Sequence, residues 1–193
     1  MLKQKEDVNR KRRRFCLIVA AAGIGSLLNS EAHAASAREI DHAADVALTS
    51  LYAENAKARI LGQRAFGILV FPRIIEGGFI LGGQSGDGVL LLNGRKAAYY
   101  NISAGSFGLQ AGAQKFSYAL FFMNVAALDY LRRNNGWTIG SGPSVVVADK
   151  GVARSLTNMT LTQDVYAFPF GQKGLMAGVD LEGAKITKIS PQP

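Results

Sequence analysis

The chain has 193 residues, of which 48% are hydrophobic and 19% are charged. This composition fits one globular domain with a substantial core and excludes wholesale disorder. The formal net charge of +8 suggests an acidic partner, but much of this charge lies at the N-terminus. Residues 1–14 hold seven basic side chains, residues 15–28 are uncharged and mostly apolar, and Ala32-His33-Ala34 follows with a small-x-small pattern. This order predicts a signal peptide over 1–34 and one domain over 35–193.

Two questions about export stay open at this stage. Arg12-Arg13-Arg14-Phe15 also loosely fits a twin-arginine signal, so the route is either general secretion or twin-arginine export. The alternative to cleavage is an N-terminal anchor that remains on the protein. Cleavage would remove seven basic and three acidic residues from totals of 22 and 14, leaving 15 and 11 and a net charge of +4. We expect an exported protein, periplasmic or secreted, that is mildly basic and contains no cysteine.

The first elements of the predicted domain are two helices. Ser36 and Glu39 have the spacing of a capping box, and apolar residues from Ile40 recur at helical spacing until about Tyr52. A second, shorter helix is predicted over 56–65. We expect both helices to pack on the sheet and cover its apolar face.

The stretch from Phe66 to Gln114 is rich in glycine and in short apolar runs. So much glycine would cost a helix about 1 kcal/mol per residue relative to alanine, whereas a sheet uses it at bulges and close approaches. We predict a curved meander of about five strands, with Asn93-Gly94 as a two-residue hairpin turn and Gly86-Asp87-Gly88 as another turn.

The rest of the chain predicts one buried strand, one helix and further strands. Residues 116–123 form a continuous apolar run, Asn124 resembles an N-cap, and a helix follows near 125–135. Later strands are predicted over 137–139, 144–148, 165–170, 175–181 and 184–189. The fold class is therefore α+β, a strongly bent antiparallel sheet (a meander or partial barrel) with the N-terminal helices packed on it.

The sequence offers little for catalysis. His42 is the only histidine after residue 34, and a lone histidine on a helix is far more often a surface or packing residue. We find no zinc-ligand cluster, no nucleophile elbow and no phosphate-binding loop. We therefore expect no catalytic residues, no metal and no cofactor, and hence no enzyme. The basic residues are dispersed rather than gathered in a stripe, so we expect no nucleic-acid partner.

A set of motifs in order and in register resembles a known family. These motifs are Gly67-Ile68-Leu69-Val70-Phe71-Pro72, Gly78-Phe79 with Gly82-Gly83, Gly86-Asp87-Gly88-Val89-Leu90, Tyr99-Tyr100, Ser106 to Gln114, Gly174 to Val179, Leu181-Glu182-Gly183 and Ile186-Thr187. Together they resemble the SYLF domain, also called the Ysc84-type domain, over about 38–189.

The resemblance implies a lipid-binding module without known catalytic residues. Eukaryotic relatives bind phosphoinositides and other anionic phospholipids with help from an N-terminal amphipathic helix, fungal relatives also bundle actin, and bacterial members are small exported proteins. We do not expect an exported protein to come into contact with actin. The resemblance predicts non-enzymatic binding of anionic phospholipid at a membrane of the cell envelope, and the alternative is a structural or protein-interaction component without a lipid ligand.

The residues expected to meet the lipid are basic, with apolar neighbours. The first set is Lys57, Arg59 and Arg64, close behind the first helix, and Arg73 and Lys173 complete the predicted lipid-binding residues; Arg132 and Arg133 come next. Apolar contact is expected from any exposed members of Ile40, Leu48 and Leu51, which otherwise face the core. Neither the lipid species nor the oligomeric state follows from the sequence.

Overall fold

The computed structural model describes residues 35–133, 136–148, 162–173, 181 and 183–193, and for 79–81, 106–113 and 173 it describes the backbone alone. Residues 35–193 form one compact unit. Its helices are α2 (Ala37–Glu54), α3 (Ala56–Arg64) and α4 (Val125–Arg133). Its strands are β1 (Gly67–Leu92), β2 (Arg95–Phe122), β3 (Gly136–Thr138), β4 (Val145–Val147), β5 (Val165–Lys173) and β6 (Lys185–Ile189).

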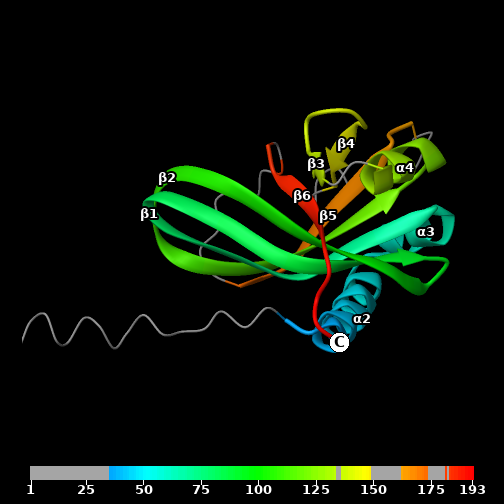
Figure 1. Ribbon diagram of the computed structural model, residues 1–193, viewed down its shortest axis with the longest axis horizontal. Coiled ribbons are helices and arrows are strands. Elements are labelled where there is room, and N and C mark those ends of the chain that lie inside the picture. Colours follow the sequence, from blue (N-terminus) through cyan, green and yellow to red (C-terminus); the bar gives the residue numbers. More distant parts are fainter. Residues whose placement is uncertain (1–34, 134–135, 149–161, 174–180, 182) are drawn as a thin grey trace, which may run out of the picture. The chain divides into compact units, whose positions relative to one another are not determined.

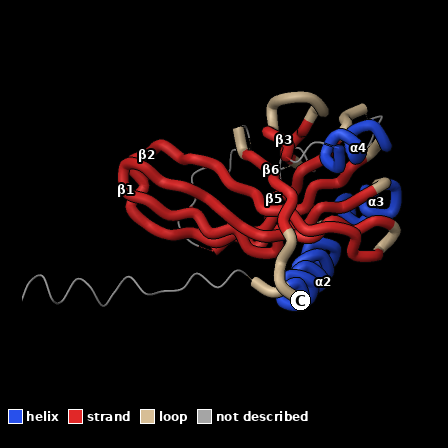
Figure 2. The backbone as a smooth tube through the Cα atoms, in the orientation of Figure 1, coloured by secondary structure: helices blue, strands red, loops and turns tan. Residues whose placement is uncertain are grey.

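These strands form one strongly curled sheet, shown in Figures 1 and 2. The order is β3-β6-β2-β5-β4, and β1 pairs with β2 outside this path. The predicted α+β class, the strong bend, the N-terminal helices on the sheet and the helix near 125–135 are all confirmed. The sheet is mixed rather than purely antiparallel, because β4 runs parallel to β5. The predicted strand over 175–181 lies outside the described residues, except for Leu181.

The glycine-rich stretch forms one long hairpin instead of a five-strand meander. β1 and β2 pair antiparallel from Gly67 with Phe122 to Leu92 with Arg95. The predicted turn at Asn93-Gly94 is confirmed, with φ values of 51° and 74°. The glycine pairs do not end strands, because the ladder continues through them and the bends are taken up by three register shifts.

The prediction of a turn at Gly86-Asp87-Gly88 is wrong, since these residues lie inside β1. A methyl group on Gly86 would come within 3.0 Å of the carbonyl oxygen of Arg73, and one on Gly88 within 3.0 Å of that of Val70. The two halves of β1 therefore cross with their backbones nearly in contact, which only glycine permits. Glycine here allows a close crossing of two extended segments, and no reversal of the chain.

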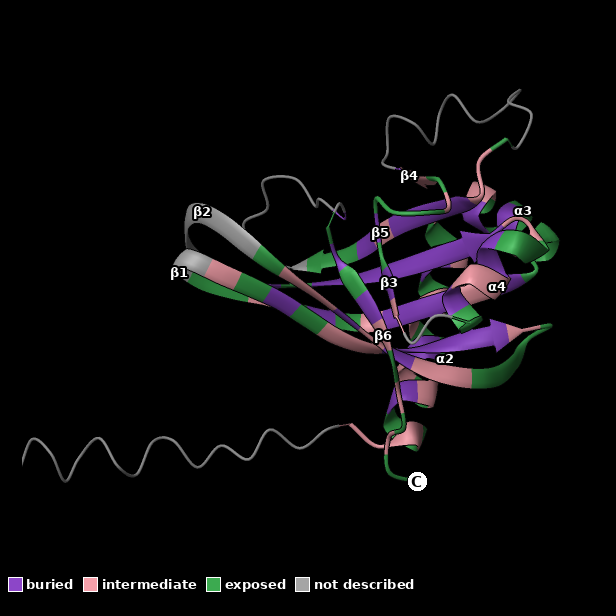
Figure 3. Ribbon diagram, turned by 45° about the horizontal axis from the view of Figure 1, so that its top comes forward, coloured by how far each residue is buried: buried purple, intermediate pink, exposed green. Residues whose placement is uncertain are grey.

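The hairpin encloses the main core, and the N-terminal helices cover its other face. Figure 3 shows buried residues along β1, β2 and β5. The main core cluster joins residues from both halves of the hairpin with α4, β3, β5 and β6; its members include Leu69, Phe71, Leu90, Tyr100, Leu120, Leu131, Trp137, Val165 and Ile186. On the other face, Ile40 and Ala44 of α2 pack with Val70, Val89 and Leu91 of β1.

Local signals explain where the helices begin and end. The predicted capping box at Ser36 and Glu39 is present, and α2 extends two residues beyond the predicted end at Tyr52. Asn55 ends α2 and begins α3, because its Oδ1 accepts hydrogen bonds from the backbone N–H groups of Lys57 and Ala58, both at 3.1 Å. Asn124 caps α4 as predicted, accepting from the N–H of Ala127 at 2.8 Å.

Candidate functional site

The first described helix, α2, packs against the sheet and does not expose its apolar face to solvent. Ile40 and Leu51 are each only 3% exposed, and Leu48 is partly buried in the same packing. The expectation that these residues contribute apolar contact to a membrane is therefore wrong for Ile40 and Leu51, and their alternative role in the core is the one observed.

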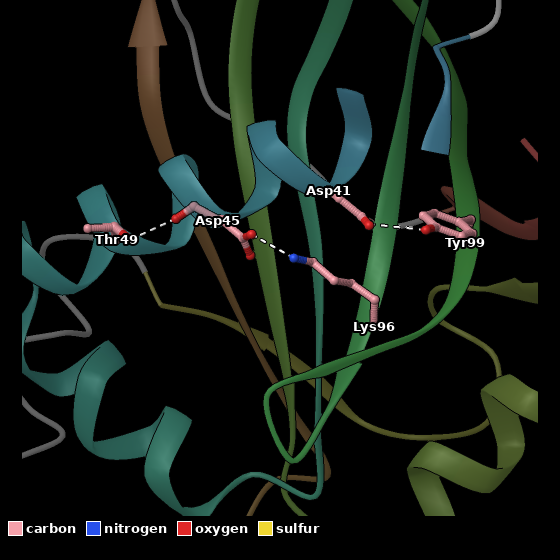
Figure 4. A network of polar contacts seen from close by, with 5 residues as sticks. All are labelled: Asp41, Asp45, Thr49, Lys96 and Tyr99. Carbon is pink, nitrogen blue, oxygen red and sulfur yellow. Dashed lines mark hydrogen bonds and ion pairs between the residues drawn. The ribbon is translucent and has the colours of Figure 1, made fainter. Parts of the chain in front are cut away.

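Polar contacts on the rim of α2 reinforce this docking, as Figure 4 shows. Lys96 Nζ lies 2.6 Å from Asp45 Oδ2, and the Tyr99 hydroxyl donates to Asp41 Oδ1 at 3.2 Å. Lys96 and Tyr99 lie near the start of β2, and Asp41 and Asp45 are one helical turn apart, so these contacts hold one turn of α2 against the sheet. Burial and the Asp41 carboxylate both raise the pKa of Tyr99, burial being the larger cause, so its hydroxyl stays a donor.

The three predicted cations of α3 occupy different environments. Arg59 and Arg64 are exposed, and Arg59 also donates from Nη2 to the carbonyl oxygen of Tyr52 at 2.6 Å. The Nζ atom of Lys57 is buried and has no hydrogen-bond partner within the described part of the chain. Arg59 and Arg64 are thus presented to solvent, whereas the Lys57 amine is not.

Two large apolar side chains that the sequence analysis did not single out lie within two residues of these arginines in the sequence and are also exposed. Ile60 is 49% exposed and Phe66 is 51% exposed. Ile60 and Arg64 are four residues apart and so lie on the same face of α3, and Phe66 follows directly after the helix. We call Arg59, Ile60, Arg64 and Phe66 the α3 patch.

The other two predicted residues belong to a different part of the sheet. Arg73 is exposed in the β-bulge between Phe71 and Ile74. The ladder aligns Ile75 with Lys115 and Lys115 with Lys173, so Lys173 stands in register two strands away from Ile75. Ile75 is 47% exposed and Lys115 is exposed. The register therefore places Lys173 in one row with Lys115, a residue that the prediction missed, whereas Arg73 lies in the bulge two residues before Ile75 and has no partner in this row.

A third cationic region is a groove of about 470 Å³ beside α4. Its charged residues are Asp129, Arg132 and Arg133 from α4 and Lys188 from β6, and its apolar residues are Leu90, Leu92, Ala97, Ala98 and Tyr100. We call this the α4 groove. Of these residues the sequence analysis had named Arg132 and Arg133 as the next candidates for lipid contact; Lys188 was not named.

Outside these three cationic regions, few of the described side chains are suited to metal binding or catalysis. Among the residues that the structure describes, no group of three or more His, Cys, Asp or Glu is placed to hold a metal ion. His42 is exposed on α2. Within the same ranges, none of the helices combines the length and apolar character needed to cross a membrane.

Comparison with known proteins agrees with the motifs of the sequence. Residues 103–190 match the family model Ysc84, described as "Las17-binding protein actin regulator". The resemblance to the SYLF, or Ysc84-type, domain is thereby confirmed for this part of the chain, which holds most of β2, α4 and the strands that follow. The family is described by binding and regulation, not by a reaction. A search of curated proteins found no match.

Proposed function

We propose that this chain, whose residues 103–190 match the Ysc84 family model, binds the surface of anionic phospholipid membranes in the cell envelope without catalysing a reaction. The observation that carries the proposal is the α3 patch. Two exposed arginines and two half-exposed large apolar side chains occur there within residues 59–66. Side chains of these two kinds are what peripheral membrane binding combines.

The patch favours anionic over zwitterionic lipid. Each arginine near an anionic surface contributes about 1 kcal/mol, and salt screens this contribution within a Debye length. Ile60 and Phe66 each leave about half of their surface in water, and that surface gains free energy on entering the acyl boundary. Arg73 and Lys115, which are both exposed, add further positive charge for a membrane that extends across the sheet.

Export supports the choice of membrane. The compact unit begins at Ala35, directly after the predicted cleavage site at Ala34. A mature chain of this extent retains every helix and strand that the structure describes. We propose a periplasmic or secreted protein, peripheral on an envelope membrane. The family description names actin regulation, but export would separate this protein from actin, and the proposed partner is therefore lipid.

Cosedimentation of the full chain with vesicles tests the proposal. Phosphatidylglycerol vesicles are compared with phosphatidylcholine vesicles at low and high salt. We expect Arg59→Gln/Arg64→Gln to weaken binding to the anionic vesicles by about 30-fold at low salt, since two arginines contribute about 2 kcal/mol together. Ile60→Ser/Phe66→Ser should weaken binding at both salt concentrations, because the apolar term is not screened.

The matched control removes the same kinds of side chain from another exposed surface. Arg38→Gln/Val46→Ser on α2 also loses one exposed arginine and one exposed apolar side chain, Val46 being 57% exposed. Thermal melts accompany all variants, since Arg59 also bonds the end of α2. Equal binding of patch and control variants would reject the α3 patch. Negligible binding of the parent to both vesicle types would favour a structural or protein-interaction role in the envelope.

A further inference from the structure

The α4 groove combines a cationic rim with an apolar floor. Lys188 is brought to it by the β2–β6 ladder, which aligns Lys188 with Tyr100. Arg132 and Arg133 come from the last turn of α4. These three cations face a single carboxylate among the lining residues, that of Asp129. The rim therefore carries a net positive charge, and its three cations come from two elements that are far apart in the sequence.

Asp129 orients the arginines without neutralising them. Its two oxygens lie 3.7 Å from Arg132 Nη1 and 3.5 Å from Arg133 Nη2. Both guanidinium groups remain largely open, with 54% and 75% of their side chains exposed. Exposed ion pairs at such distances contribute little energy. The guanidinium donors that Asp129 does not use therefore remain available to a second anion.

The apolar floor of the α4 groove disfavours a ligand whose main part is polar. Leu90, Leu92, Ala97 and Ala98 offer only hydrocarbon from their side chains, and Tyr100 is 1% exposed. Arg132 and Tyr100 both line the groove. Burial raises the pKa of Tyr100, and the positive charge of Arg132 opposes this shift. A ligand must therefore present an anionic group at the rim and hydrocarbon to the floor.

We propose that the α4 groove binds one anionic, single-chain amphiphile. Its carboxylate or phosphate would lie among Arg132, Arg133 and Lys188, and its alkyl chain would cover Leu90, Leu92, Ala97 and Ala98. The groove volume falls within the range of about 300–1,000 Å³ typical of sites for small organic ligands. This site is separate from the α3 patch: it takes a single molecule from solution or from a bilayer, whereas the patch meets a surface.

Calorimetric titration of the full chain tests the site, with decyl phosphate and decanoate below their micelle concentrations. Decanol supplies the chain without charge, and inorganic phosphate supplies charge without the chain. We expect both anionic amphiphiles to bind one per chain, and each partial probe to bind at least about tenfold more weakly. Inorganic phosphate binding as tightly as decyl phosphate would overturn the proposal, and so would failure of both amphiphiles to bind.

Variants separate the groove from general charge effects. Arg132→Gln/Lys188→Gln should weaken decyl phosphate binding by about tenfold or more. Ala97→Phe should weaken it by filling the groove from an exposed position. Lys185→Gln is the matched control, because Lys185 lies on the same strand but an odd number of residues from Lys188, and so on the opposite face. Equal affinities of the groove variants and the control would overturn the assignment.

The two proposals fail independently. Substitutions in the α4 groove are expected to weaken amphiphile binding by about tenfold or more and to leave vesicle cosedimentation within about twofold of the parent. Arg59→Gln/Arg64→Gln should weaken vesicle cosedimentation and leave amphiphile binding within about twofold of the parent. If amphiphile binding follows the α3 substitutions instead, the groove is not the site. A vesicle pull-down with phosphatidylglycerol containing lysophosphatidic acid shows whether the amphiphile is taken from a membrane: binding that rises with the lysolipid in the parent but not in Arg132→Gln/Lys188→Gln identifies that source.

Discussion

Replacing Gly88 with alanine should destabilise the domain although alanine is the smallest side chain that can be added. Gly88 is buried in β1, and its new methyl group would come within 3.0 Å of the Val70 carbonyl oxygen and of ring carbon Cδ1 of Phe71. Val70 and Phe71 are both 0% exposed, so neither can yield toward solvent. The two crossing halves of β1 would have to separate.

The expected magnitude follows from two opposing terms. Overpacking a well-filled core costs about 1–3 kcal/mol, and a glycine-to-alanine change gains about 0.4–1 kcal/mol by restricting the unfolded chain. The net loss lies between about 0 and 2.6 kcal/mol and is about 1.3 kcal/mol at the midpoints of the two ranges, which corresponds to a fall in Tm of roughly 3–5 °C for a domain of this size. Gly86→Ala should behave similarly, because its methyl group would meet the Arg73 carbonyl oxygen and Ile74.

Thermal melts followed by circular dichroism decide the matter, with Gly105→Ala as the matched control. Gly105 lies in β2, and a methyl group there would have nothing within 4 Å. That variant keeps only the unfolded-state gain and should melt at or slightly above the parent temperature. If Gly88→Ala melts as high as Gly105→Ala, the halves of β1 do not approach each other as described, and the reasoning is refuted.

Three further predictions concern acid stability, the docking of α2 and export. The N–H of Ser144, with help from its hydroxyl and from Asn124, lowers the pKa of Asp164 below its ordinary value of 3.8. The stability that the Asp164 carboxylate contributes is therefore present above pH 3.8 and is lost as the pH falls through its lower pKa in the folded protein. In an acid titration, Asp164→Asn should be less stable than the parent at neutral pH, and the difference should vanish in strong acid. A difference in stability that does not depend on pH would contradict this reasoning. A double-mutant cycle on Lys96 and Asp45, whose side chains are 34% and 55% exposed, should give a coupling below about 1 kcal/mol that falls with salt; a larger, salt-independent value would mean a buried contact. Mass spectrometry of the protein from its native host should find Ala35 as the first residue, whereas an intact N-terminus would mean a retained anchor.

Elements with local signals could be predicted from the sequence, and those set by distant partners could not. The capping box at Ser36, the N-cap at Asn124 and the turn at Asn93-Gly94 are decided by side chains within a few residues. Gly86 and Gly88 are ambiguous by sequence, because glycine serves both a turn and a close crossing. The choice between a turn and a close crossing is decided by the backbone of β1 at Arg73 and Val70, about a dozen or more residues earlier in the sequence. The parallel pairing of β4 with β5 is equally non-local.

The candidate sites also combine residues that the sequence reveals with residues that only the fold brings into place. Charge is visible in a sequence, so Arg59, Arg64, Arg132 and Arg133 could be named from it. Exposure of apolar side chains is not visible, since it depends on what covers them, and Ile60 and Phe66 were therefore missed. Lys188 is basic but isolated in the sequence. Only its register opposite Tyr100 brings it to α4.

The docking of α2 decides which helix faces a membrane. Undocking α2 would expose Ile40 and Leu51, whose burial contributes about 1.5–3 kcal/mol each. A membrane could return that energy, but α2 has four acidic residues, Glu39, Asp41, Asp45 and Glu54, and a single basic residue, Arg38. An anionic surface repels this net negative charge. The helix α3 contains no acidic residue, and its sequence, AKARILGQR, carries Lys57, Arg59 and Arg64. Because Ile60 and Phe66 are already exposed, the proposed contact of α3 with a membrane would not require any part of the core to unfold. Under the proposed function, α3 therefore takes the role that the N-terminal amphipathic helix has in relatives, while α2 covers the sheet.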